Sequence, residues 1–176
     1  MYKTVVFDLD GTLLNTLTDL ADAGNRLCRK YGWPTHERQA YRYFVGNGIP
    51  KLVERLAPAD QRTPAVLEAA LADFKRDYGQ HLRDTTAPYP GIPEMLAKLK
   101  ANGVQLAVFS NKADALAKEV VKDYFGTQYF TIVRGQMTGV APKPAAEGTN
   151  ALLQALHADP ASTLYVGDSN VDVETA

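Results

Sequence analysis

The chain has 176 residues, of which 45% are hydrophobic, and its 19 Lys and Arg nearly balance its 20 Asp and Glu to give a formal net charge of −1. This composition is typical of a globular protein with a substantial core, and the balanced charge predicts no binding to nucleic acid or to an anionic membrane surface. No stretch approaches the about 18 apolar residues of a membrane span, and the single cysteine, Cys28, excludes an internal disulfide, so we expect a cytoplasmic protein.

The first predicted element is a strand over residues 4–7, which the segment DLDGT follows at residues 8–12. Because side chains alternate along a strand, Asp8 and Asp10 are expected to point together, with Cα atoms about 6–7 Å apart. Without a metal the two acids would repel each other, whereas a bound divalent cation would keep both ionised. The alternative interpretation is a solvated strand end with a glycine turn.

A helical block follows. Apolar residues recur at helical spacing over residues 17–31, and two further helices are predicted to begin near Pro50 and Pro64, because proline suits the first turn of a helix. We find no convincing strand between residues 17 and 85.

From residue 89 onward, helices alternate with strands. Helices are predicted over residues 93–102, 113–124 and 145–156, and strands over residues 105–109, 130–133 and 163–166. Such alternation implies a parallel sheet with helices on both faces. The sequence therefore predicts an α/β fold, with a doubly wound parallel sheet in residues 1–15 and 86–176 and an inserted helical domain in residues 16–85.

Polar residues stand where ligands bind in such sheets, beyond the carboxyl ends of the strands. They are Asp8, Asp10, Ser110, Asn111 and Asp168, with Lys143 in a loop at the same edge. Singly, each has a structural alternative: the Ser-Asn pair and Asp168 could cap helices, Lys143 could be a solvated lysine, and Asp172 could be an exposed surface acid. Together they suit magnesium and phosphoryl chemistry, because carboxylates bind Mg²⁺ and one carboxylate can act as a covalent nucleophile.

Four motifs occur in order: DLDGT at residues 8–12, FSN at 109–111, the lysine of KP at 143 and GDSNVD at 167–172. By these motifs the chain resembles the haloacid dehalogenase-like superfamily of phosphohydrolases, and the match spans nearly the whole chain. The resemblance implies a Rossmann-like core with a helical cap inserted after the first strand, Mg²⁺ as the cofactor and a small phosphorylated metabolite as the partner.

The resemblance also implies roles for these residues. Asp8 is the nucleophile that forms an aspartyl-phosphate, Asp10 protonates the leaving oxygen and then activates water, and Lys143 pairs with the phosphate and with Asp8. The implied phosphate ligands are Thr12, Ser110, Asn111 and Lys143. The implied metal ligands are Asp8, the backbone carbonyl of Asp10, and Asp168, with Asp172 in support.

The helical block holds the features that bear on the substrate. Its segment RYFVGNG at residues 42–48 resembles the cap of phosphoglycolate phosphatases, which implies hydrolysis of 2-phosphoglycolate to glycolate and phosphate. The glycines allow close backbone approach, and the basic residues are candidates for the substrate carboxylate. The candidate contacts are Arg42, Gly46, Asn47, Gly48 and Lys51. The alternative interpretation is a glycine-bounded turn with solvated cations.

Other functions stay open: a phosphosugar mutase resembling β-phosphoglucomutase, another small-metabolite phosphatase of the family, or a catalytically idle binding protein on the same fold. The chain departs from the family at Asn15, where relatives commonly carry an acid, and it stops at Ala176 just as a helix should begin. We therefore expect a fragment, with the strand over residues 163–166 at an uncovered edge. The oligomeric state is not predicted.

Overall fold

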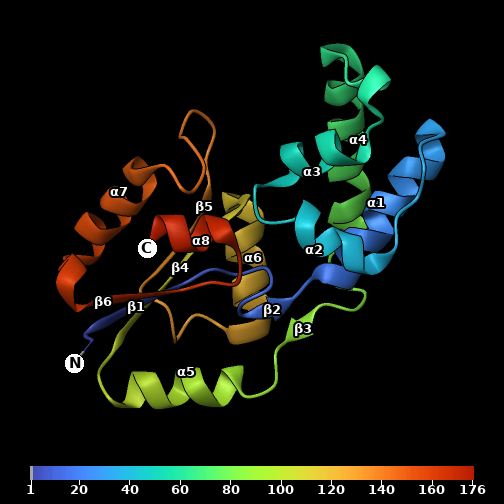
Figure 1. Ribbon diagram of the computed structural model, residues 1–176. Helices are drawn as coiled ribbons and strands as arrows, with labels where there is room; N and C mark the ends of the chain where they lie inside the picture. The colour runs from blue at the N-terminus through green and yellow to red at the C-terminus, as the bar shows by residue number, and fades with distance from the viewer. Residues whose placement is uncertain (1) are drawn as a thin grey trace. The chain divides into compact units, whose positions relative to one another are not determined.

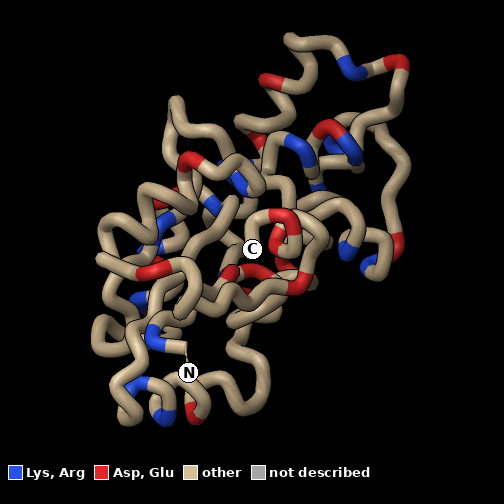
Figure 2. Tube along the Cα trace, turned by 60° about the vertical axis from the view of Figure 1, so that its left-hand side comes forward, with Lys and Arg blue, Asp and Glu red and all other residues tan. Residues whose placement is uncertain are grey.

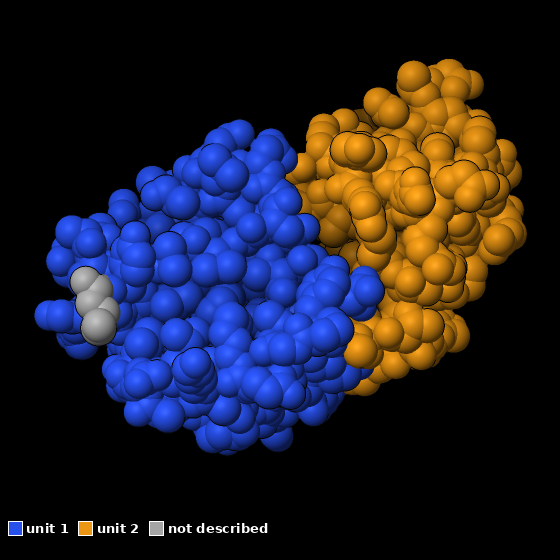
Figure 3. Space-filling view, turned by 60° about the horizontal axis from the view of Figure 1, so that its bottom comes forward, with its two compact units in different colours: residues 1–15, 88–176 blue, residues 16–87 orange. Residues whose placement is uncertain are grey.

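The computed structural model describes residues 2–176 and divides the chain into two compact units (Figure 3). The first unit comprises Met1–Asn15 and Pro88–Ala176, and the second comprises Thr16–Ala87. Acidic and basic residues are interspersed along the chain (Figure 2). Among residues 2–176, no helix combines the length and the apolar character needed to span a membrane.

The first unit is built on a four-stranded parallel sheet (Figure 1). Its strands, in the order β5-β4-β1-β6, are β5 (Ile132–Gln136), β4 (Gln105–Ala113), β1 (Thr4–Phe7) and β6 (Thr163–Val166). Its helices are α5 (Ile92–Ala101), α6 (Asp114–Phe125), α7 (Ala146–Leu156) and α8 (Asn170–Thr175). Helices α5 and α6 contact β4, and α7 contacts β5. The predicted α/β class with a parallel sheet is confirmed.

The core of this unit explains the apolar first strand. All four residues of β1 are buried, as expected for a central strand of a parallel sheet whose faces are covered by helices. Strands covered in this way are apolar throughout rather than alternating. In register, Phe7 pairs with Val108 on one side and with Val166 on the other. The carboxyl ends of three strands therefore meet at one edge of the sheet.

Strand β4 is longer than predicted, because it continues through polar residues after Phe109. The ladder to β5 pairs Phe109 with Arg134 and then Ala113 with Gln136, so three residues of β4 face Gly135 alone. Such a bulge lets a strand continue while re-aiming its side chains. A Cβ on Gly135 would collide with the carbonyl oxygen of Lys112, so glycine is needed opposite the bulge.

The second unit is helical: α1 (Leu17–Tyr31), α2 (Tyr41–Phe44), α3 (Ile49–Leu56) and α4 (Pro64–His81). Helix α1 has the predicted bounds and ends at Gly32, whose φ of 67° suits a residue without a Cβ. Helix α4 begins as predicted, with Pro64 in its first turn after Thr63. Two short strands, β2 (Leu14–Asn15) and β3 (Ala87–Pro88), form a separate sheet that was not predicted, since two residues show no periodicity.

A buried carboxylate holds the two ends of the second unit together. Asp19, in the first turn of α1, is 2% exposed. Its Oδ1 accepts a hydrogen bond of 2.9 Å from the backbone N–H of Thr85, and its Oδ2 accepts bonds of 2.9 and 2.8 Å from the N–H and hydroxyl of Thr86. Hydrogen bonds to a charged acceptor are stronger than neutral ones, and leaving their donors unpaired is costly.

Asp19→Ala is therefore expected to lower the free energy of unfolding of the second unit by about 2–4 kcal/mol. The measurement is urea unfolding followed by the fluorescence of Trp33, the single tryptophan, which is buried in this unit. Asp22→Ala, an exposed acid on the same helix, is the matched control and should leave the transition unchanged. Equal transitions for the two variants would contradict the clamping role of Asp19.

Candidate active site

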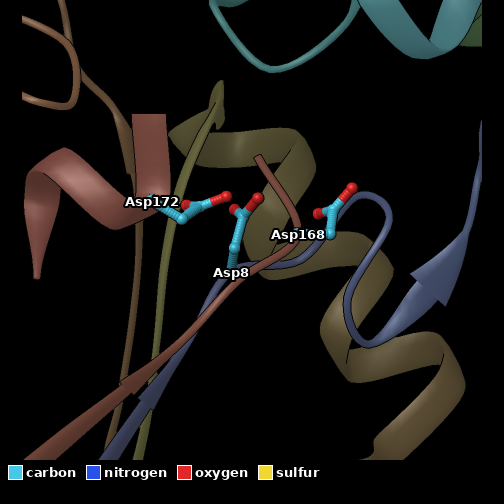
Figure 4. Close-up of side chains that lie close together, drawn as sticks. All are labelled: Asp8, Asp168 and Asp172. Carbon is cyan, nitrogen blue, oxygen red and sulfur yellow. The ribbon is translucent and has the colours of Figure 1, made fainter. Parts of the chain in front are cut away.

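Three carboxylates converge beyond the ends of two neighbouring strands. Asp8 follows β1, Asp168 follows β6, and Asp172 lies on α8; Figure 4 shows their carboxyl groups close to one another. One oxygen from each lies within 4.8 Å of the others. The backbone N–H of Asp8 donates to the carbonyl of Val166 at 2.9 Å, which continues the pairing of β1 with β6 beyond the strand ends. This arrangement is a candidate site for a metal ion.

Asp172 differs from the alternative in which it is an exposed acid on the same helix face as Asp168. Helix α8 begins only at Asn170, and Asp172 is 2% exposed. Its Oδ2 accepts bonds of 2.6 and 3.0 Å from the hydroxyl and N–H of Ser169, in a capping box. A Cβ on Gly167 would collide with the Asp172 carboxyl, which explains the glycine of the GDSNVD motif.

Lys143 lies at the centre of the site, in the loop before α7, and is 3% exposed. Its Nζ donates to the carbonyl of Phe109 at 3.0 Å, to the hydroxyl of Tyr165 at 2.8 Å and to Oδ1 of Asp172 at 2.8 Å. An ammonium group has three N–H donors, so these bonds use all of them. Nζ also lies 3.0 Å from Oδ1 of Asp8, where the attraction is one of charge.

Asp8 is consequently a buried carboxylate whose Oδ1 interacts with Lys143 through charge alone. Its Oδ1 accepts no hydrogen bond from residues 2–176. Burial raises the pKa of Asp8 from 3.8 to about 6, which Lys143 opposes and the neighbouring carboxylates of Asp172 and Asp10 reinforce. Such an oxygen is available to a cation or to an electrophile.

The other two carboxylates have opposite shifts. Burial raises the pKa of Asp168, against the hydrogen bond of 3.0 Å that its Oδ1 accepts from the Thr12 hydroxyl. For Asp172, burial acts in the same upward direction, but the ion pair and hydrogen bond with Lys143 and the hydrogen bonds from Ser169 together outweigh burial and lower the pKa. Gly11, with φ of 89°, leaves room for the Asp168 carboxyl, because a Cβ on Gly11 would collide with it.

The donor set fits a divalent cation. Mg²⁺ prefers carboxylate oxygens together with water and substrate oxygens, and the cluster offers an Asp8 oxygen that accepts no hydrogen bond from residues 2–176 and an exposed carboxylate on Asp168. The Asp10 side chain lies instead against Lys112, with Nζ 3.0 Å from Oδ1. Its predicted contribution through the backbone carbonyl stays a prediction.

The bulge of β4 presents the predicted phosphate ligands Ser110 and Asn111, both buried. Oγ of Ser110 accepts a bond of 3.2 Å from the N–H of Lys112. The Asn111 amide makes two bonds with the backbone of Lys143, accepting from its N–H at 2.8 Å and donating to its carbonyl at 3.2 Å. The Asn111 side chain therefore anchors the Lys143 loop, and the phosphate contacts of these residues stay predictions.

Sequence reasoning missed two residues of the site. Tyr165, on β6, places its hydroxyl against Lys143 and 3.2 Å from Asp172, and burial raises its pKa. Lys112 directly follows the FSN motif, and this position was the signal available from the sequence. A lone lysine in a polar segment, however, is usually exposed to solvent. Nothing in the sequence assigned the Tyr165 hydroxyl a role in the site, since an aromatic residue in a strand is ordinarily a core residue.

The predicted substrate residues lie in the second unit. Arg42 is exposed on α2, and Gly46 and Gly48 adopt φ of 105° and 83°. Lys51 pairs with Glu54 at 2.7 Å on the surface of α3.

Asn47 is held by Arg55, a residue that was not among the predicted substrate contacts. One guanidinium nitrogen of Arg55 donates to Oδ1 of Asn47 and the other donates to the carbonyl of Phe44, each at 2.9 Å. Arg55 thus fixes the shape of the loop over residues 45–48, and the contacts of this loop with a substrate stay predictions.

Comparison with known proteins agrees with this geometry. Residues 5–176 match the haloacid dehalogenase-like hydrolase family. The chain is 32% identical to a phosphoglycolate phosphatase of Thiobacillus denitrificans over 99% of this chain and 78% of the relative, and 30% identical to one of Aquifex aeolicus over 98% and 78%. A crystal structure from Lactobacillus delbrueckii subsp. bulgaricus has a TM-score of 0.92 at 28% identity, covering 99% of this chain and 81% of that chain. The chain therefore belongs to the haloacid dehalogenase-like hydrolase family and is a phosphoric monoester hydrolase.

Proposed function

We propose that this protein is a magnesium-dependent phosphatase that hydrolyses a small phosphate monoester, 2-phosphoglycolate, to glycolate and phosphate. One observation carries the mechanism: Oδ1 of the buried Asp8 accepts no hydrogen bond from residues 2–176, although the carboxylates of Asp168 and Asp172 and the ammonium group of Lys143 lie beside it. The substrate is supported by relatives of at least 30% identity named phosphoglycolate phosphatase. Such a metabolite is consistent with the proposed cytoplasmic location.

The reaction proceeds in two displacements at phosphorus. An Asp8 oxygen attacks, the bond from phosphorus to the ester oxygen breaks, and the departing oxygen takes a proton from Asp10, which gives the free alcohol and an aspartyl-phosphate. Asp10 then takes a proton from water as that water attacks the phosphoryl group. Phosphate leaves, and the carboxylate of Asp8 and the proton of Asp10 are restored.

The surrounding residues stabilise the negative charge on the reacting groups during these steps. Lys143 places a positive charge 3.0 Å from Asp8, where the transferring phosphoryl group carries negative charge. Asp8 and Asp168 would hold the Mg²⁺ ion together with the backbone carbonyl of Asp10, and Asp172 supports the site by fixing Lys143. When bound, the ion supplies positive charge that keeps Asp8 ionised and stabilises the phosphoryl oxygens.

The size of the barrier explains why several groups are required. Phosphate monoester hydrolysis is among the slowest uncatalysed reactions, so the site must lower the barrier by about 20 kcal/mol or more. Proton transfer by Asp10 contributes about 10²–10⁴-fold, equivalent to about 3–5 kcal/mol. Covalent capture on Asp8 and the charges of Lys143 and Mg²⁺ supply the remainder.

Phosphate release from p-nitrophenyl phosphate, with Mg²⁺ and with EDTA, tests the reaction class. A panel of 2-phosphoglycolate, sugar phosphates and nucleotides then tests the substrate. We expect release only with Mg²⁺ and a kcat/KM for 2-phosphoglycolate at least about tenfold above the other esters, because its carboxylate adds one charged contact.

Two outcomes would overturn parts of this proposal. A preference for another ester would remove the substrate assignment and leave the phosphatase. Conversion of β-glucose 1-phosphate to glucose 6-phosphate without net phosphate release would identify a mutase.

A further inference from the structure

The carboxylate of Asp10 has a partner that none of the four motifs contains. Nζ of Lys112 lies 3.0 Å from Oδ1 and 3.3 Å from Oδ2 of Asp10. The Lys112 side chain is 2% exposed and that of Asp10 is 15% exposed. The ammonium group therefore contacts both oxygens of the carboxylate, whereas Asp10 keeps part of its surface open.

The position of Lys112 beside Asp10 does not come from the regular alternation of side chains along a strand. Lys112 lies in the bulge of β4, where its N–H donates to Oγ of Ser110 and its carbonyl approaches Gly135 so closely that a Cβ would not fit. A buried lysine is unfavourable unless it is paired, because its ammonium group loses the solvation of water. The bulge thus holds Lys112, whose burial is unfavourable without a partner, in one orientation, with its ammonium group facing Asp10.

We propose that Lys112 is a positioning residue, which holds the Asp10 carboxyl in the orientation that delivers a proton to the leaving oxygen and later receives one from water. This inference rests on the proposed function, since it assigns Lys112 a part in the work of Asp10. A carboxyl group rotates readily about its terminal torsion. Contact with both of its oxygens restrains that rotation, and a misplaced proton donor loses much of its effect.

A positioning role for Lys112 predicts that the loss of kcat/KM depends on the leaving group, which a purely structural ion pair would not produce. An alkoxide is a strong base and needs a proton as it departs, whereas a nitrophenolate is a weak base and departs without one. Lys112→Met should therefore lower kcat/KM for 2-phosphoglycolate by about 10²-fold. For p-nitrophenyl phosphate, kcat/KM should change less than about threefold, because it reports only the steps through loss of nitrophenol.

The second half-reaction supplies an independent signature. Asp10 also activates the water that hydrolyses the aspartyl-phosphate, so Lys112→Met should slow that step. With p-nitrophenyl phosphate, kcat should fall while kcat/KM is retained, and rapid mixing should show a burst of one nitrophenol per enzyme. An acid-quenched mass spectrum should show the accumulated phosphoenzyme.

Three variants serve as comparisons. Lys112→Arg retains a cation with several donors and should recover part of the lost kcat/KM for 2-phosphoglycolate. Lys118→Met is the matched control, because Lys118 forms an ion pair of 2.7 Å with Asp114 on the surface of α6 and is 56% exposed. Lys118→Met should leave kcat/KM unchanged for both substrates. Lys112→Gln, whose side chain is one atom shorter but keeps an N–H donor, replaces Lys112→Met if that variant does not fold.

The outcomes for the two esters decide whether Lys112 has the positioning role. Equal losses of kcat/KM for the two esters, or no loss for either, would overturn the positioning role while leaving the phosphatase assignment intact. Failure of both Lys112→Met and Lys112→Gln to fold would show that Lys112 is structural and would also overturn it. If the unsubstituted protein hydrolysed neither ester, the proposed function itself would fail, and the inference with it.

Discussion

Asp8→Asn is expected to lower kcat for phosphate release by about 10⁴-fold or more, while the protein remains folded. The carboxamide is nearly isosteric with the carboxylate, but its oxygen is a poor nucleophile, so no phosphoenzyme can form. Folding should be preserved because Lys143 keeps its partners Phe109, Tyr165 and Asp172. The measurements are phosphate release from 2-phosphoglycolate and thermal unfolding by circular dichroism.

Asp22→Asn is the control for this substitution, because Asp22 is an exposed acid in the second unit and should retain full activity. Acid-quenched mass spectra should show a phosphoryl adduct on the unsubstituted protein and none on Asp8→Asn. Substantial turnover by a folded Asp8→Asn protein would contradict covalent catalysis by Asp8.

Removal of divalent metal is expected to abolish turnover, and addition of Mg²⁺ to raise the Tm of the protein. A bound metal ion would neutralise the cluster of Asp8, Asp168 and Asp172, whose oxygens lie within 4.8 Å of one another. Asp168→Asn should weaken both responses, because it removes one negative charge and one ligand. The measurement is thermal unfolding with EDTA or with increasing Mg²⁺, beside phosphate release. A Tm that does not respond to Mg²⁺ in the unsubstituted protein would contradict the metal site.

The stabilisation by Mg²⁺ should also depend on pH. Burial raises the pKa of Asp8 to about 6 in the folded protein, above its ordinary 3.8. The stability that this raised pKa contributes is fully present below pH 3.8 and is lost as pH rises through about 6. Bound Mg²⁺ would offset the unfavourable energy of the ionised, buried Asp8, so the rise in Tm should be larger at pH 8 than at pH 5. An equal rise at both pH values would show that Asp8 is ionised throughout.

The sequence by itself determined the class of fold and the motif order, because these depend on local patterns. The apolar run of β1, the helical spacing of α1 and the alternation of helices and strands from residue 89 onward each act over a few residues. The rule that strand ends converge then predicted that Asp8, Lys143 and Asp168 share one sheet edge, and they do.

Only the tertiary structure decided how these residues divide their contacts. Lys112 and Asp10 are 102 positions apart, and their pairing depends on a bulge that no periodicity reveals, since its residues are polar. Likewise, Lys143 donates its three N–H groups to Phe109, Tyr165 and Asp172. An Asp8 oxygen is therefore left without a hydrogen bond from residues 2–176. A side chain has a fixed number of donors, and which acceptors receive them is set by three-dimensional proximity rather than by sequence spacing.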